Sequence, residues 1–149
     1  MTVWRAIASV AGIGRAPFAP GTVASAVAAI TGVALLRFGV WGPLLGAATA
    51  TGLGVVALRR LGPTIANTDP GWVVIDEVAG QWLAIAGIAA WSRPWWGAAV
   101  AFAGFRVLDI LKPGPIGWLD ARHGPVAIMA DDVAAGFCVM VPLTVMGMS

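Results

Sequence analysis

Two adjacent pairs of carboxylates are the residues of this chain best suited to chemistry. Asp76 and Glu77 form one pair and Asp131 and Asp132 the other, and each pair precedes an apolar run. Backbone N–H groups at a helix start stabilise negative charge, which explains one acid in each pair. A second acid beside it repels the first unless a cation joins them. Because hard carboxylate oxygens suit Mg²⁺, both pairs are candidate metal ligands, with plain helix caps as the alternative.

A second group of charges is spaced for one face of a helix. Arg106, Asp109 and Lys112 follow one another at three-residue steps, and Pro113 ends the helix after them. An intrahelical ion pair would account for Arg106 and Asp109. The functional interpretation has Arg106 and Lys112 binding phosphate oxygens while Asp109 joins the metal or handles a proton.

The N-terminal segment 1–21 is rich in glycine and proline and leads into the first apolar run. Thr22 is the expected N-cap of that helix, and Ser25 follows it. A helix N-terminus facing the acids could bind an anionic headgroup, with Arg15 beside it. His123, the single histidine, lies in a loop and is either solvated or a proton donor.

Three known kinds of phosphate-releasing site need residues that this sequence does not supply. A cysteine phosphatase needs a Cys-x5-Arg loop, and the residue six positions after Cys138 is Thr144. Histidine-based lipid phosphatases need more than one histidine. An aspartyl-phosphate enzyme typically has an Asp-x-Asp pair, which does not occur here. A metal-carboxylate mechanism remains.

The composition places these groups in a membrane. Of the 149 residues, 59% are hydrophobic and 11% are charged, against roughly one quarter charged in soluble domains. The net charge of +2 gives no support to nucleic-acid binding. We predict an all-α, polytopic transmembrane bundle in a single domain, residues 1–149, with about four to five membrane helices. Helices are expected at about 22–36, 42–58, 76–91, 95–111 and 131–147, with loops at 59–75 and 112–130.

Five crossings would distribute the charges unevenly. Most basic residues fall on one side, Arg37 and Arg93 fall on the other, and the positive-inside rule makes the richer side cytoplasmic. All seven acids fall at or near this same side. Acids present only for solubility would appear on both sides, so the pattern predicts a polar site under the cytoplasmic headgroups. If the second apolar run is a re-entrant hairpin that does not cross the membrane, this assignment of charges to the two sides no longer holds.

Four motifs occur in order along nearly the whole chain. They are Gly12-x-Gly14-x-x-Pro17-x-Ala19-Pro20-Gly21-Thr22-x-x-Ser25, Asp69-x-Gly71-x-x-Val74-x-Asp76-Glu77-x-x-Gly80, Phe105-Arg106-x-x-Asp109-Ile110-x-Lys112-Pro113-x-Pro115-Ile116 and Ile128-Met129-x-Asp131-Asp132-x-x-Ala135-Gly136. This series resembles the phosphatidylglycerophosphatase A family of the bacterial inner membrane. Members remove the terminal phosphate of phosphatidylglycerophosphate and leave phosphatidylglycerol.

The resemblance implies a multi-pass, Mg²⁺-dependent lipid phosphatase whose site faces the cytoplasm. It carries over five carboxylates as metal ligands, namely Asp76, Glu77, Asp109, Asp131 and Asp132. Of these, Glu77, Asp109 and Asp132 are the expected catalytic residues. Substrate contacts are expected from Arg106, Lys112, Arg15, Thr22 and Ser25. The oligomeric state stays open, as does the choice between water and an aspartate as nucleophile.

Two departures from the family pattern bear on substrate fit. Ala24 stands where the family usually has glycine, and the segment 124–127 replaces a more glycine-rich loop. Two other functions remain as alternatives. The acids of a small transporter or binding protein would coordinate a cation or protons without turnover. A structural membrane subunit would use them only as helix caps.

Overall fold

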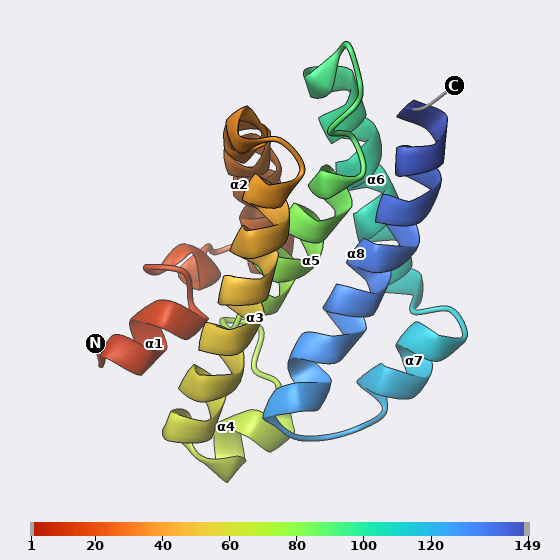
Figure 1. Ribbon diagram of the computed structural model, residues 1–149. Coiled ribbons are helices and arrows are strands. Elements are labelled where there is room, and N and C mark those ends of the chain that lie inside the picture. The colour runs from red at the N-terminus through yellow and green to blue at the C-terminus, as the bar shows by residue number, and fades with distance from the viewer. Residues whose placement is uncertain (1, 148–149) are drawn as a thin grey trace.

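The computed structural model describes residues 2–147, and the regular elements in that range are all helices (Figure 1). The long helices are α2 (Pro20–Leu35), α3 (Trp41–Leu61), α5 (Ile75–Ala86), α6 (Pro94–Leu111) and α8 (Pro125–Gly147). The shorter elements are α1 (Val3–Ala8), η1 (Ile13–Arg15), η2 (Leu36–Phe38), α4 (Pro63–Thr68) and α7 (Pro115–Asp120). The predicted all-α fold class is confirmed.

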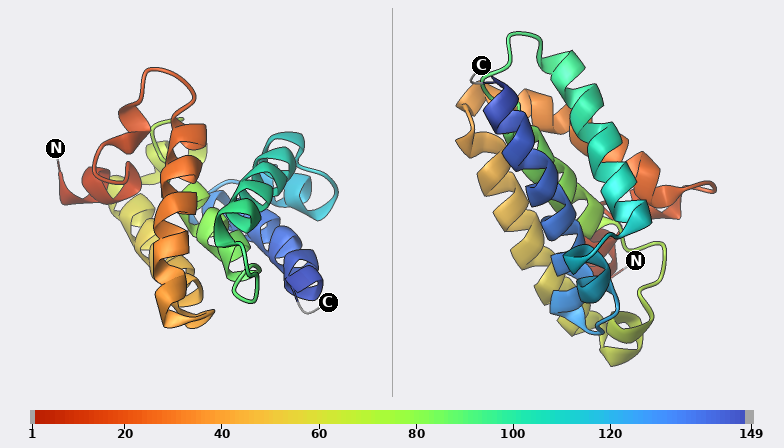
Figure 2. Two further views of the ribbon diagram at one scale, coloured as in Figure 1. Left: turned by 90° about the horizontal axis from the view of Figure 1, so that it is seen from above. Right: turned by 90° about the vertical axis from the view of Figure 1, so that its right-hand side faces the viewer.

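Helix α5 lies at the centre of the bundle and packs against α2, α3, α6 and α8 (Figures 1 and 2). Nine of its twelve residues are buried, so it is a core element. Successive long helices run in alternating directions. The connections 36–40 and 87–93 therefore lie at one end of the bundle, and α4 and α7 lie at the other (Figure 1).

Glycines bring α5 close to α8 and to α2. A Cβ added at Gly136 of α8 would collide with the backbone carbonyl of Gly80 in α5. A Cβ added at Gly80 would collide with the backbone carbonyl of Asp132. On the other side of α5, a Cβ at Gly21 of α2 would collide with the Glu77 carboxylate. Small residues permit such approaches between membrane helices, and here they draw three helices together around the acids.

Among the described residues, three helical stretches are long and apolar enough to cross a membrane: Pro20–Phe38, Trp41–Leu61 and Pro125–Gly147. Helix α5 has 12 residues and is about 18 Å long, well short of the ~30 Å hydrocarbon core. Exposed tryptophans gather near the helix ends, at Trp41, Trp95, Trp96 and Trp118, as expected of side chains at a membrane interface. The membrane character is confirmed, and the number of four to five spans stays a prediction.

The predicted start of the last helix is wrong. Helix α8 begins at Pro125 because Gly124, with φ 108°, ends the preceding turn and proline suits the first helical position. Asp131 and Asp132 therefore lie about two turns inside α8, and helix capping does not explain them.

Three other boundaries also differ from the prediction. Helix α2 begins at Pro20 with Ala19 as its N-cap residue, so Thr22 is its third residue and not its cap. Helix α5 ends at Ala86 because the chain from Gly87 onward closes into tighter i→i+3 hydrogen bonds. The predicted loops 59–75 and 112–130 contain α4, α7 and the start of α8.

We expect Gly136→Ala to lower the free energy of unfolding by about 1–3 kcal/mol, because its new methyl group overpacks the contact between α8 and α5. Gly52→Ala in α3 is the matched control, since nothing lies within 4 Å of a Cβ there. Alanine also favours the helix, so the control should be neutral or slightly more stable. Thermal unfolding in detergent measures both. Equal behaviour of the two variants would contradict the close approach at Gly136.

Candidate functional site

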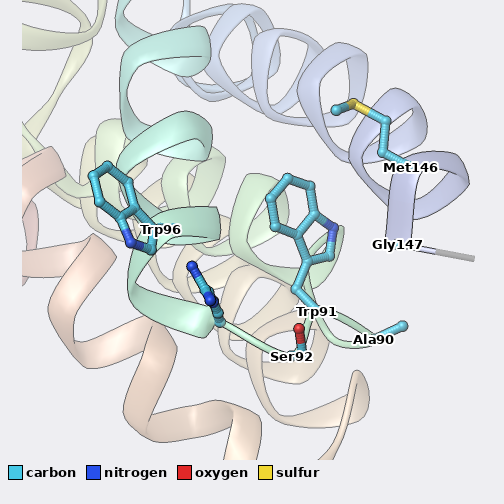
Figure 3. Close-up of a pocket in the computed structure, with 7 residues that line it drawn as sticks. Ala90, Trp91, Ser92, Trp96, Met146 and Gly147 are labelled. Carbon is cyan, nitrogen blue, oxygen red and sulfur yellow. The ribbon is translucent and has the colours of Figure 1, made fainter. Parts of the chain in front are cut away.

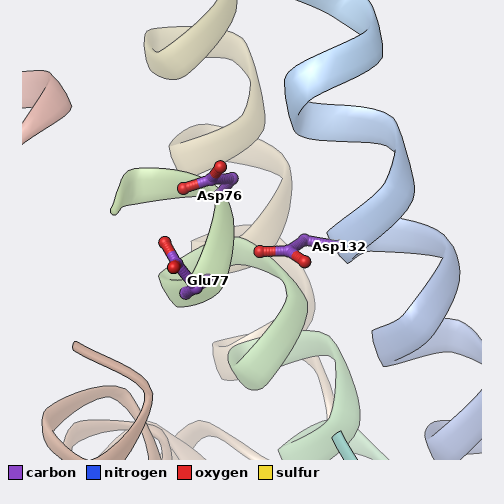
Figure 4. Close-up of side chains that lie close together, drawn as sticks. All are labelled: Asp76, Glu77 and Asp132. Carbon is purple, nitrogen blue, oxygen red and sulfur yellow. The ribbon is translucent and has the colours of Figure 1, made fainter. Parts of the chain in front are cut away.

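Three carboxylates from two helices converge inside the bundle. Asp76 and Glu77 project from the first turn of α5, and Asp132 faces them from α8 (Figure 4). One oxygen from each of the three lies within 4.8 Å of the others. Asp76 is only 7% exposed and Asp132 only 4%. We call these three residues the acid cluster.

Two features of the fold place the acid cluster. Asp76 and Glu77 are the second and third residues of α5, where the helix dipole favours negative charge. Asp132 is brought opposite them by the close approach of α8 at Gly80. Asp76 and Glu77 are not simple caps, since no side chain caps the N-terminus of α5.

The acid cluster fits a hard divalent cation. Asp76 Oδ1 and Glu77 Oε2 are buried, and neither has a hydrogen-bond partner among the described residues. A buried carboxylate oxygen without a partner is costly, and a metal ion removes that cost. Three carboxylates also supply the oxygen ligands that Mg²⁺ and similar ions prefer. These residues can therefore hold a metal.

Helix α6 adds a cation and a fourth acid beside the cluster. Arg106 Nη1 donates to Asp109 Oδ2, as the three-residue spacing predicts, and both side chains are largely buried. Asp109 is close enough to Glu77 and Asp132 for their charges to interact, and Arg106 is close enough to interact with Glu77. The Nε of Arg106 is buried without a described partner. Arg106 thus keeps a donor for a further group.

Lys112 forms a separate charged network at the end of α6. Its Nζ donates to Asp120 of α7 and, at 2.8 Å, to Asp131 of α8. Burial lowers the pKa of Lys112, but the two carboxylates outweigh burial and raise it overall, so the side chain stays protonated. Neighbouring helical side chains point about 100° apart, which explains how Asp131 faces Lys112 while Asp132 faces the cluster. Asp131 lies outside the acid cluster.

The N-terminal residues lie around the cluster in different ways. Gly21, in the first turn of α2, directly abuts Glu77, and Thr22 beside it is half-buried. The hydroxyl of Ser25 donates to the Gly21 carbonyl at 2.9 Å, so α2 itself occupies that donor. Arg15 is exposed and lines a different pocket, of about 200 Å³, together with Arg5.

Two further pockets are not lined by any residue of the acid cluster. His123 lines a cavity of about 140 Å³ with Asp69, Asp120 and Asp131, not with the acid cluster. At the opposite end of the bundle, a pocket of about 540 Å³ holds Trp91 and Trp96, and no acid lines it (Figure 3).

Gln81 is the residue that sequence reasoning missed. It lies one turn after Glu77 on α5, is 0% exposed, and both atoms of its amide group lack a hydrogen-bond partner among the described residues. A buried amide without partners is unfavourable unless water or a ligand satisfies it. The signal was present in the sequence, as a single uncharged polar residue four positions after Glu77 in an apolar helix.

Comparisons with known proteins identify the family to which these residues belong. The model of the family described as Phosphatidylglycerophosphatase A matches residues 6–147. A protein of that name from Escherichia coli is 35% identical over 136 residues, covering 89% of this chain and 77% of the relative. The protein of that name from Haemophilus influenzae is 38% identical over 119 residues, covering 78% of this chain and 72% of the relative.

A third relative has a different name. It comes from Bacteroides thetaiotaomicron, is named provisionally as a phosphatidylinositol-3-phosphatase, and is 35% identical over 130 residues, covering 84% of this chain and 81% of the relative. No solved structure matches the chain significantly.

We expect Gln81→Leu to lower the phosphatase activity without lowering the stability of the fold. Leucine replaces an unsatisfied amide by an apolar group of similar size, so the unfolding temperature should stay the same or rise. If the amide binds water or substrate in the site, phosphatase activity should nevertheless fall about tenfold or more. Thermal unfolding and phosphate release, measured on the same preparation, test this. A loss of stability without any loss of activity would contradict it.

The carboxyl group of Asp69, in the connection before α5, predicts a pH effect on stability. Burial, and then the charge of Asp131, raise the pKa of Asp69, so the folded state holds this proton more tightly than the unfolded state. The charged form therefore destabilises the fold at neutral pH, and this cost vanishes as the pH falls below the ordinary value of 3.8. Asp69→Asn should raise the unfolding temperature at pH 7, because asparagine also tolerates the left-handed backbone there (φ 41°).

Unfolding curves of Asp69→Asn and the parent protein, recorded in chelator from pH 4 to pH 7, measure this effect. The gain should shrink as the pH falls. A variant no more stable than the parent at pH 7 would rule out the penalty on charged Asp69.

Proposed function

The chain belongs to the phosphatidylglycerophosphatase A family and is a membrane phosphatase, and on that premise we propose that it hydrolyses the terminal phosphomonoester of phosphatidylglycerophosphate with Mg²⁺ as cofactor. The products are phosphatidylglycerol and inorganic phosphate. The observation that carries the proposal is the acid cluster, in which a buried oxygen of Asp76 and one of Glu77 lack a hydrogen-bond partner within residues 2–147, in a bundle of helices apolar enough to cross a membrane.

The carboxylates of Asp76, Glu77 and Asp132 would hold the ion. Bound Mg²⁺ would neutralise charge on the phosphoryl group and lower the pKa of an attacking water. Asp131 is not grouped with these three, and one oxygen of its carboxylate accepts from Lys112, so a metal role for Asp131 stays a prediction.

Arg106 and Asp109 act as a pair beside the ion. Asp109 orients the guanidinium of Arg106, whose remaining donors bind the phosphoryl oxygens as negative charge moves among them. Asp109 also lies close to Asp132 and Glu77, where a carboxyl group can take a proton from water or give one to the leaving oxygen. Whether water or one of the carboxylates attacks phosphorus stays open.

The other residues predicted to contact the substrate would bind its headgroup. Lys112 stays charged while Asp120 and Asp131 hold it, and a phosphate arriving at the cluster would compete with them for its ammonium group. Gly21, at the start of α2, abuts Glu77, and the neighbouring Thr22 and the backbone N–H groups of this first turn would bind further headgroup oxygens. Arg15 is close to the surface and would act at the level of the lipid headgroups.

We further propose that the acid cluster faces the cytoplasm. The elements at its end of the bundle include α4 and α7, and most of the basic residues belong to that end (Figure 1). Arg37 in η2 and Arg93 before α6 belong to the opposite end. By the positive-inside rule, this distribution supports an orientation with the acids at the cytoplasmic side of the bacterial inner membrane.

Two other activities would use the same residues. The name of the Bacteroides relative raises phosphatidylinositol 3-phosphate, which presents the same phosphomonoester on a different headgroup. A cation transporter or binding protein would fill the acid cluster without releasing phosphate. Phosphate release from each lipid distinguishes these possibilities.

We expect purified protein in mixed micelles to release phosphate from phosphatidylglycerophosphate with Mg²⁺ present and to lose this activity in chelator. Asp76→Asn, Glu77→Gln and Asp132→Asn should each reduce the rate at least about 100-fold, since each removes a charged ligand while keeping the side-chain shape. Asp120→Asn, at an exposed acid outside the cluster, should keep most of the activity. Substantial activity in all three cluster variants would refute the proposed site, and faster turnover of phosphatidylinositol 3-phosphate would refute the proposed substrate.

A further inference from the structure

An apolar groove of about 690 Å³ follows the outside of the bundle between α1, α3 and α5. Ile7 of α1 and Val10, which follows that helix, line it together with Leu45 and Leu53 of α3 and Val78 of α5. No charged side chain lines the groove among the described residues. Thr49 is its one hydroxyl-bearing lining residue, so the surface suits hydrocarbon better than a polar ligand.

The groove begins beside the acid cluster. Ile75 and Val78 line it, and on the first turn of α5 they flank Asp76 and Glu77. Helix side chains at neighbouring positions point in different directions, so this turn presents carboxylates on one side and apolar groups on another. A molecule that is polar at one end and apolar at the other could contact both sides of the same turn.

The groove follows a membrane-spanning helix. The α3 residues that line it recur at helical spacing from Gly42 to Leu53, which is about 16 Å along the helix axis. Gly46 and Ala50 also line the groove, and because neither carries a large side chain, they leave its space unfilled. Since α3 is long and apolar enough to cross the bilayer, the groove extends in the direction in which lipid chains extend.

Helix α1 closes the outer side of the groove as an amphipathic helix. Its apolar residues Val3, Ala6 and Ile7 face the groove, whereas Arg5 lies over the ring of Trp72, 5.6 Å from its centre. This division between apolar and basic faces is typical of a helix lying at the membrane interface.

We propose that this groove binds one acyl chain of the substrate lipid and so positions the phosphomonoester at the acid cluster. The proposal rests on the proposed function, because it assigns the phosphate end of the same lipid to Asp76, Glu77 and Asp132. An acyl chain is favoured as the occupant because the groove is lined almost entirely by apolar residues, runs along a membrane span and adjoins a polar site.

Thr49→Phe tests the proposal by narrowing the groove. Thr49 is an exposed residue that lines it, and Ala48 is the exposed neighbour that does not, so Ala48→Phe is the matched control. We expect Thr49→Phe to lower kcat/KM for long-chain phosphatidylglycerophosphate about tenfold, mainly through KM, as the loss of roughly two buried CH₂ contacts would. Activity on the water-soluble headgroup without acyl chains should be unchanged. Equal effects of the two variants on the lipid would overturn the proposal.

A binding measurement separates this proposal from the proposed function. Phosphatidylglycerol, the proposed product, is prepared with a photoreactive acyl chain in vesicles containing Mg²⁺, and phosphatidylcholine with the same chain is the comparison. We expect phosphatidylglycerol to label α1 and α3 around the groove more strongly, and Thr49→Phe but not Ala48→Phe to reduce the labelling. Equal labelling by both lipids would show ordinary bilayer contact and overturn the groove. Selective labelling without any phosphate release would uphold the groove and refute the phosphatase function.

Discussion

The structure depends on keeping three like-charged carboxylates together inside a helix bundle. Asp76, Glu77 and Asp132 repel one another, and burying such charges is costly unless a cation or a proton compensates them. They are nevertheless adjacent because α5 and α8 meet at Gly80 and Gly136, where neither helix can accept a side chain. The packing contact and the polar site are therefore one structural feature. A change that separates the helices also separates the ligands.

Charges outside the acid cluster connect the elements that surround it. Lys112 ends α6 and binds acids of α7 and α8, so three consecutive helices meet at one ammonium group. The chain adopts a left-handed backbone at Lys112 and also at Ala19 and Asp69, all without glycine's freedom. Such conformations cost roughly 1 kcal/mol or more each and persist where surrounding contacts enforce them. Each of the three lies in a connection beside a helix that contributes to the site.

The sequence predicted the membrane helices and the gathering of acids because both follow from patterns along the chain. Apolar runs show where helices lie, and acids confined to the ends of those runs must meet if the helices alternate in direction. The separate roles of Asp131 and Asp132 do not follow from that pattern, because the apolar run after them predicts that a helix starts at this pair. With α8 beginning at Pro125, the two side chains leave the helix in different directions, one toward Lys112 and the other toward the cluster. Only the packing between helices decides which of the two acids faces Lys112 and which faces the cluster.

The depth of the acid cluster constrains how a phosphate can reach it. Asp132 lies about 10 Å along α8 from its first residue, and α5 begins only after the chain has passed through α4 and the segment 69–74. Glu77 is also shielded by the start of α2 at Gly21. A soluble phosphate ester would have to leave bulk water to approach this position, whereas a lipid already spans the boundary between headgroups and hydrocarbon. Burial of its acyl chain offsets the free-energy cost of drawing its phosphate below the surface. The depth that makes the buried carboxylates unfavourable therefore also favours a membrane substrate over a soluble one.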